Sequence, residues 1–472
     1  MRPWSGENSD RYASGLSRMR DLRAIRVLFG GVLVYLLLVA PPSLAQEAIL
    51  NDRPVTPSVA EEPVSIKPTL DERIGTGVLT PYLHKLAHLP PVIRDLEVGW
   101  NTRSYYFNRD RFESGRREAF ALGGALRLRT GWLADHFKIG GTLFTSQKLI
   151  GKKDRDGTKL LGPWQRSYTV LGEAYATFRH RDHAIILYRH EMDLPYVNRD
   201  DSRMTPNTFE GYKARGKFTF SNNSEVEYGL GYLDKIKLRN ASEFVSMSKA
   251  AGVDGASHGM FYGGLRFSPR ENIHFGAINY YVEDTLNIAY ADFDYLHHFG
   301  NDFAIRMRVQ FSHQRSVGDD ALTGSAFDTW FLGGRIAASY RNFTFAVGFT
   351  TTDSEMKIQN PYGSYPGFVA LMRRNFNRAG EDAWQVGVGY DFGRLGLDGL
   401  SAFANYAEGY GARDSETRES LANEREFNLT VDYKPDFGFL GGFWLRIRGA
   451  VVETDRRSTD LRVIFNHELP VF

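Results

Sequence analysis

The segment FAIRMRVQF, residues 303–311, alternates apolar and polar side chains without a break. Successive side chains of a β-strand point to opposite faces, so the pattern predicts a strand with one apolar face and one face that carries Arg306 and Arg308. The repetition of this strand pattern restricts the fold more than any other feature of the chain. The same alternation recurs in residues 121–130, 212–220, 330–340 and 443–452.

The cationic faces exclude two of the three surroundings that a strand can have. In a protein core each unpaired buried cation would cost several kcal/mol. Facing lipid, an Arg or Lys at the bilayer midplane costs about 2–4 kcal/mol. If the apolar faces contact lipid instead, the cationic faces line a water-filled lumen. The sequence therefore predicts an all-β protein, a transmembrane antiparallel up-and-down β-barrel.

We expect the lumen to carry a ladder of basic side chains. The alternative for each member is an ion pair with a lumenal acid such as Glu97, Glu225, Glu227 or Glu426, which would make it a brace of the wall. The predicted ladder residues are Arg127, Arg129, Lys213, Arg215, Lys217, Arg306, Arg308, Arg335, Arg446 and Arg448.

The spacing of the strands also fits a barrel, because short links alternate with long ones. Short turns at one end, longer loops at the other and an even strand number are typical of outer-membrane barrels. Two links that should be long, around 284 and at 455–457, are short. The eighteen predicted strands are 94–107, 117–130, 134–147, 166–180, 182–190, 209–220, 224–237, 258–267, 271–283, 285–295, 301–313, 326–340, 342–353, 381–393, 399–409, 423–434, 442–454 and 458–469.

The N-terminal residues 1–45 read as a signal peptide. Three arginines precede the apolar segment 27–40, and Ser43 and Ala45 stand where a cleavage site needs small residues. A membrane anchor is the alternative, and Met19 is a possible true start. The full chain has 58 basic and 56 acidic residues, and taking away the six arginines and three acids of 1–45 leaves a net charge near −1. This balance does not suggest a nucleic-acid partner.

Residues 46–93 form a Pro-rich stretch with little periodicity, which we interpret as a periplasmic N-terminal extension. A plain linker and a plug or partner-binding segment are both open for it. The barrel is then expected over residues 94–472. Its final strand is amphipathic and the chain ends in Phe472, as outer-membrane barrels often do.

Little in the chain points to an enzyme or to a cofactor. The sequence contains no cysteine, which excludes disulfides, thiolate metal sites and thiol catalysis. An outer-membrane hydrolase is the enzyme-class alternative. Its candidate pairs, Ser257–His258 and Ser312–His313, are adjacent in sequence and would point to opposite faces of a strand. We therefore expect no enzymatic activity.

Four segments, in this order, resemble the OprD-type specific porins of Gram-negative outer membranes. They are RSYYFNRD (103–110), LPYVNRDDSRMTPNTFEGY (194–212), NFNRAGEDAWQVGVGYDF (375–392) and LGLDGLSAFANYAEG (395–409). The resemblance covers about residues 94–472. It implies an eighteen-stranded barrel, no cofactor, and uptake of small carboxylate-bearing solutes along a basic ladder.

The resemblance also implies that the external loop 191–208 folds inward and constricts the pore. Its charged residues are then candidates for one side of the constriction, the alternative being a solvated loop shaped by its prolines. These residues are Asp193, Arg199, Asp200, Asp201 and Arg203.

The sequence thus predicts an outer-membrane porin for small hydrophilic solutes. Its expected partners are small carboxylates or other polar solutes, outer-membrane lipid and lipopolysaccharide, and the barrel-assembly machinery. Whether the barrel is a monomer or a trimer stays open. An export conduit for an acidic polysaccharide is the alternative function, since a basic lumen would serve it equally well.

Overall fold

A computed structural model of the chain describes residues 89–111, 115–435 and 442–470. The predicted signal peptide and almost all of the predicted N-terminal extension lie outside these residues. The first element is a single helical turn, α4 (Pro91–Arg94), with Pro at its start, where the missing N–H group costs nothing. Within the described ranges, no helix is both long and apolar enough to cross a membrane.

Nearly all of the remaining regular structure is β-strand. Three short 3-10 turns and the five-residue helix α5 (Met247–Ala251) lie in the links between strands. The strands are β1 (Glu97–Asp110), β2 (Arg116–Arg129), β3 (Phe137–Ile150), β4 (Tyr168–His180), β5 (His183–His190), β6 (Thr208–Thr219), β7 (Glu225–Lys237), β8 (Val245–Ser246), β9 (Met260–Arg270), β10 (Ile273–Val282), β11 (Leu286–Gly300), β12 (Phe303–Arg315), β13 (Asp328–Tyr340), β14 (Phe343–Thr352), β15 (Asp382–Asp391), β16 (Leu400–Tyr410), β17 (Glu424–Tyr433), β18 (Phe443–Glu453) and β19 (Arg457–Pro470).

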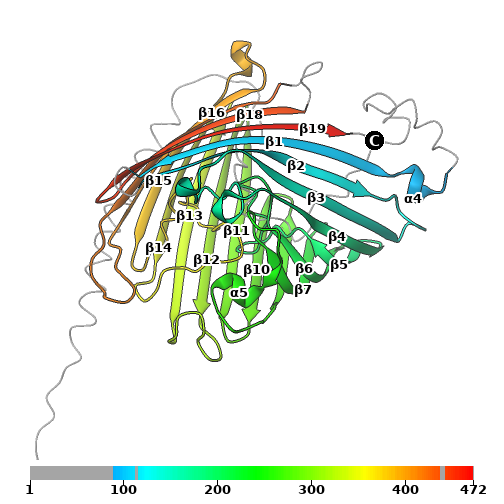
Figure 1. Ribbon diagram of the computed structural model, residues 1–472, viewed down its shortest axis with the longest axis horizontal. Coiled ribbons are helices and arrows are strands. Elements are labelled where there is room, and N and C mark those ends of the chain that lie inside the picture. The colour runs from blue at the N-terminus through cyan, green and yellow to red at the C-terminus, as the bar shows by residue number, and fades with distance from the viewer. Residues whose placement is uncertain (1–88, 112–114, 436–441, 471–472) are drawn as a thin grey trace, which may run out of the picture. The chain divides into compact units, whose positions relative to one another are not determined.

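The strands close into one antiparallel barrel (Figure 1). Each strand of the wall pairs with its neighbours in sequence, and closure comes from β1, which pairs with both β2 and β19. The two-residue β8 pairs only with β7 and lies beside the wall, which leaves 18 strands in the barrel. The predicted fold is therefore confirmed, and most strand ends agree with prediction to within three residues.

The alternation predicted for 303–311 separates two different surroundings. Met307, Val309 and Phe311 are 42–46% exposed on the outer face of β12. Gln310 and Ser312, on the opposite face, are fully buried inside the barrel. The apolar side chains thus form the outer, lipid-facing surface. Burying them in lipid rather than water is the main contribution that the membrane makes to the stability of such a wall.

The two ends of the barrel differ in the length of their connections. At one end lie two-residue links such as 181–182 and 341–342, and α4 and the end of β19 are at this same end (Figure 1). The other end carries the long loops. In barrels of this type the short turns are periplasmic and the long loops are external. The longest external loops are 151–167, 191–207, 238–259 and 353–381.

Candidate functional site

Loop 191–207 folds into the barrel and packs against the far wall. Tyr196 and Val197 are fully buried, and the ring of Tyr196 lies edge-on to that of Tyr290 on β11, with centroids 6.1 Å apart. The hydroxyl of Tyr280 on β10 donates a hydrogen bond to the Pro195 carbonyl. A loop that begins after β5 therefore reaches the inner face of β10 and β11 and occupies part of the lumen.

Loop 353–381, which connects β14 and β15, also enters the lumen. The Gln314 side chain on β12 donates to the carbonyl of Gln359 and accepts from its N–H, each at 2.8 Å. On β17, the Glu426 carboxylate accepts the backbone N–H groups of Arg373 and Arg374 at 2.7–3.2 Å. Inward side chains of distant strands thus hold this loop along its length.

The two interior loops are hydrogen-bonded to each other. The Ser364 N–H donates to Oδ1 of Asn198 at 2.8 Å, and the Asn198 amide donates to the Ser364 carbonyl at 3.2 Å. The neighbouring Gly363 must be glycine for this contact, because a Cβ there would lie 2.5 Å from the same oxygen of Asn198. The joined loops therefore narrow the lumen.

An arginine of the wall holds loop 191–207 in place. The Arg103 guanidinium on β1 donates two parallel hydrogen bonds to the Asp201 carboxylate, at 2.5 and 3.0 Å, and a third, at 2.6 Å, to the carbonyl of Arg203. Its Nε donates to Asn466 of β19 at 2.7 Å. Such a fork of parallel bonds fixes both distance and orientation, so the loop cannot shift without breaking several bonds at once.

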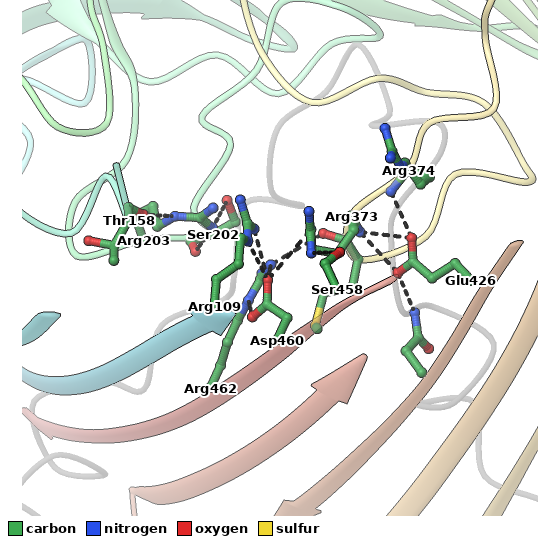
Figure 2. A network of polar contacts seen from close by, with 12 residues as sticks. Arg109, Thr158, Ser202, Arg203, Arg373, Arg374, Glu426, Ser458, Asp460 and Arg462 are labelled. Carbon is green, nitrogen blue, oxygen red and sulfur yellow. Dashed lines mark hydrogen bonds and ion pairs between the residues drawn. The ribbon is translucent and has the colours of Figure 1, made fainter. Parts of the chain in front are cut away.

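Near the external end of the same wall, several guanidinium groups surround one buried carboxylate (Figure 2). Asp460 on β19 accepts hydrogen bonds from Arg109 of β1 at 2.8–2.9 Å and from Arg462 at 3.0–3.1 Å. Arg373 of loop 353–381 lies 3.8 Å from the same carboxylate. Among these four side chains, one negative charge thus faces three positive ones.

The same cluster includes Arg203 of loop 191–207 (Figure 2). Its Nε donates to the carbonyl of Thr158 in loop 151–167 at 2.8 Å, which ties a third loop to the interior. The guanidinium groups of Arg109, Arg203 and Arg462 all lie 4.9–5.2 Å from the centre of the fully buried Phe107 ring. The electron-rich face of that ring partly offsets their mutual repulsion.

Residues 92–471 match the outer membrane porin, OprD family. The chain belongs to this family. It is an outer-membrane β-barrel porin, and the family resemblance drawn from the sequence is confirmed. No curated protein matches the chain in sequence.

Solved porin structures share the fold of this porin. OccK9 (OpdG) of Pseudomonas aeruginosa is 25% identical, with a TM-score of 0.73, and the alignment covers 81% of this chain and 100% of that one. OpdK of P. aeruginosa, solved with vanillate, is 23% identical, with a TM-score of 0.71 and coverage of 79% and 98%. A BenF-like porin from Pseudomonas fluorescens Pf-5 is 19% identical, with a TM-score of 0.72 and coverage of 80% and 100%.

The predicted basic residues of this porin fall into three groups on the inner face. The first group lies on β18 and β2, the strands next to β19 and β1, which carry Asp460 and Arg103. It contains Arg446, Arg448, Arg127 and Arg129. The second lies on β6, where the Lys213 ammonium donates to the carbonyl of Glu191; it contains Lys213, Arg215 and Lys217. The third lies across the lumen on β12 and β13 and contains Arg306, Arg308 and Arg335.

Several of these cations are paired with acids of the wall. Of the acids proposed as partners from the sequence, Glu225 pairs with Lys217 at 2.7 Å. Other pairs use acids of nearby strands: Arg127 with Glu468 at 3.2 Å, Arg446 with Asp432 at 2.7 Å, and Arg306 with Asp294. Arg308 lies opposite Arg335 in the strand register, and its guanidinium is 5.2 Å from the Phe368 ring.

The charged residues of loop 191–207 mainly fix the loop itself. Asp200 pairs with Arg239 of loop 238–259 and accepts the hydroxyl of Ser202. Asp201 and Arg203 make the contacts described above. Asp193 and Arg199 remain closer to the lumen: Arg199 is half-exposed and lies 3.9 Å from the Asp193 carboxylate and 3.7 Å from that of Glu191.

Five arginines of this site were not among the basic residues predicted from the sequence. They are Arg103, Arg109, Arg373, Arg374 and Arg462. Arg103 and Arg109 stand in the segment 103–110, which was used only for the family resemblance. The signal was present in the alternation, because both lie on the inward face that also carries Tyr105 and Phe107. No strand pattern could have placed Arg373 and Arg374, which belong to a loop.

The structure does not support either serine–histidine pair as a hydrolase site. Ser312 is buried inside the barrel, whereas His313 points outward and lies 2.8 Å from Asp328. Ser257 stands in GASHG (255–259), which has the G-x-S-x-G spacing of a nucleophile elbow, a match that the sequence reading missed. It follows α5 and precedes β9, the reverse of the strand–turn–helix order that such an elbow requires. In the part of the chain described, no three His, Asp or Glu side chains are grouped to hold a metal ion.

Proposed function

We propose that this porin admits small carboxylate-bearing solutes along the inner face of β18, β19, β1 and β2. A solute entering from the external end would meet the cluster of Arg109, Arg462 and Arg373 first. Arg448 lies opposite Arg462 in the strand register, Arg103 lies deeper, and Arg127 and Arg129 lie at the periplasmic end of β2.

The observation that carries the proposal is the charge imbalance around Asp460. A single buried carboxylate balances three guanidinium groups, and Arg448 lies directly opposite Arg462 in the strand register. A planar guanidinium can hold a carboxylate through two parallel bonds. Several such groups in a row, each holding its partner weakly, let a solute move from one to the next without being trapped.

Passage along this wall is tested by comparing two triple variants that remove equal charge. The ladder variant is R127Q/R129Q/R448Q, and the control is R306Q/R308Q/R335Q on the opposite wall. In liposome swelling assays we expect the ladder variant to lose most of its entry rate for benzoate or vanillate while keeping that for an uncharged sugar. The control should lose less. Equal loss in both variants, or none in either, would contradict a preferred wall.

The export of an acidic polysaccharide gains no support from the comparisons, since the structures named above are porins or porin-fold proteins. A hydrolase is not supported by the placement of its candidate residues. The proposal therefore stays with small solutes, and the acidic side of the constriction is assigned to Asp193 beside Arg199.

A further inference from the structure

We propose that a row of alternating charges on the outward face of the barrel binds phosphorylated glycolipid headgroups of the outer leaflet. The row lies at the external ends of β16–β19, β1 and β2. It is separate from the lumen and from the solute path. Its arginines would contact the phosphates, and its acids would bind the divalent cations that lie between neighbouring phosphates.

The strand register places opposite charges side by side. Glu408 of β16 is opposite Arg425 of β17, Arg425 is opposite Glu453 of β18, and Glu453 is opposite Arg457 of β19. Arg425 lies 2.8 Å from Glu408, and Arg457 lies 3.8 Å from Glu453. Four neighbouring strands thus present one continuous line of alternating sign.

The line continues across the closure of the barrel. Asp110 at the end of β1 is opposite Arg116 of β2. The Glu118 carboxylate binds Arg116 at 3.0 Å and also pairs with Arg155 of loop 151–167. The row therefore extends from β16 to β2 and includes four arginines, Arg425, Arg457, Arg116 and Arg155.

These side chains point toward the membrane side of the wall. On β17, Arg425 shares its face with Phe427 and Leu429, which are 48% and 44% exposed, while the intervening Glu426 is fully buried in the interior. Tyr406, one position below Glu408 on the same face, lies against Trp384 with ring centroids 5.5 Å apart. Aromatic girdles mark the border of the hydrocarbon region, so the charged row lies just beyond it, at headgroup level.

The exposure of the row suits a ligand better than a purely structural role. The side chains of Arg425, Arg457 and Glu453 are 52–62% exposed. Exposed ion pairs of this kind contribute little to stability, about 0–1 kcal/mol each, so they do not account for the row as a brace. Each guanidinium has five N–H donors, and one carboxylate uses at most two or three of them. Phosphate oxygens are the matching acceptors, and carboxylates are suitable ligands for Ca²⁺ or Mg²⁺.

The test measures lipid binding to the full-length porin in detergent by native mass spectrometry. The probe is a diphosphorylated glucosamine lipid with Mg²⁺, and the variant is R116Q/R425Q/R457Q. The matched control, R181Q/R270Q/R394Q, removes three exposed arginines at the periplasmic end. We expect the first variant to bind the lipid about tenfold more weakly than wild type, and the control to bind it normally.

Four results would overturn the proposal. The first is unchanged lipid binding in R116Q/R425Q/R457Q. The second is equal weakening in the control, which would mean general charge attraction. The third is complete displacement of the lipid by millimolar inorganic phosphate, which would identify a simple anion site. A dimer that wild type forms and this variant loses would assign the row to contact between two copies instead.

Discussion

Arg103 on β1 and Asp201 in loop 191–207 are 98 residues apart in sequence and are joined by two hydrogen bonds of 2.5 and 3.0 Å. This pair ties the constricting loop to the wall that carries the proposed solute path. The same guanidinium thus has two roles: it fixes the loop and adds a positive charge to the wall.

The two roles can be separated by R103Q and D201N. Both variants break the tether, so both should show noisier single-channel currents as loop 191–207 moves. Their selectivities should shift in opposite directions, because R103Q removes a positive charge from the path and D201N removes a negative one. Reversal potentials across a salt gradient check this. Quiet currents in both variants would mean that other contacts hold the loop.

Asp460 should be a critical residue for the stability of the barrel. Its side chain is fully buried and bonds to both Arg109 and Arg462, so D460N would leave buried guanidinium groups without their carboxylate. Breaking a buried pair in this way costs about 3–5 kcal/mol. Urea unfolding in detergent micelles measures the loss. The control D455N changes an aspartate that is 72% exposed and should have almost no effect. Equal stability of the two variants would contradict this assignment.

Glu426 should control the order of loop 353–381. Its carboxylate accepts the backbone N–H groups of Arg373 and Arg374, and hydrogen bonds to a charged group contribute about 1.5–3 kcal/mol. In E426Q the loop should open more often, and trypsin should cleave after these arginines at least about tenfold faster. E408Q, which alters a glutamate on the outer face, is the matched control. Cleavage of E426Q at the wild-type rate would show that the glutamine contacts suffice.

Glu191 should make the selectivity depend on pH. Burial, with the nearby Glu173, raises the pKa of Glu191 to about 8. The carboxyl group is then neutral at pH 7 and becomes negative as the pH rises through about 8. The new charge would oppose Arg127 and Arg199, so anion selectivity should fall between pH 7 and 9. Reversal potentials over this range test the effect, which E191Q should abolish. A pH-independent wild type would contradict it.

Much of the wall was predictable because a strand converts alternation directly into inside and outside. The segment 303–311 shows this: its apolar residues are outside, and Arg306 and Arg308 are inside. The strand number and the position of the long links followed from the same pattern. These features depend on residues near one another in sequence.

The interior could be predicted only in part, because its contacts join distant segments. Gln314 with Gln359 and Asn198 with Ser364 depend on how two long loops cross a lumen, and no periodicity marks those residues. The ladder partners Asp294, Asp432 and Glu468 were missed for the same reason, whereas Glu225, the partner of Lys217, was among the acids named from the sequence. Which acid neutralises Arg306 or Arg446 depends on strand register, which places Asp294 and Asp432 on the adjoining strands.

The arginine-rich wall of this porin is proposed to carry anions. The most direct measurement is the reversal potential of the refolded wild-type porin in a planar bilayer across a salt gradient, before and after addition of benzoate. An anion-selective current that benzoate reduces is the expected result. A cation-selective current that benzoate leaves unchanged would contradict it, and would mean that the wall acids neutralise the arginines.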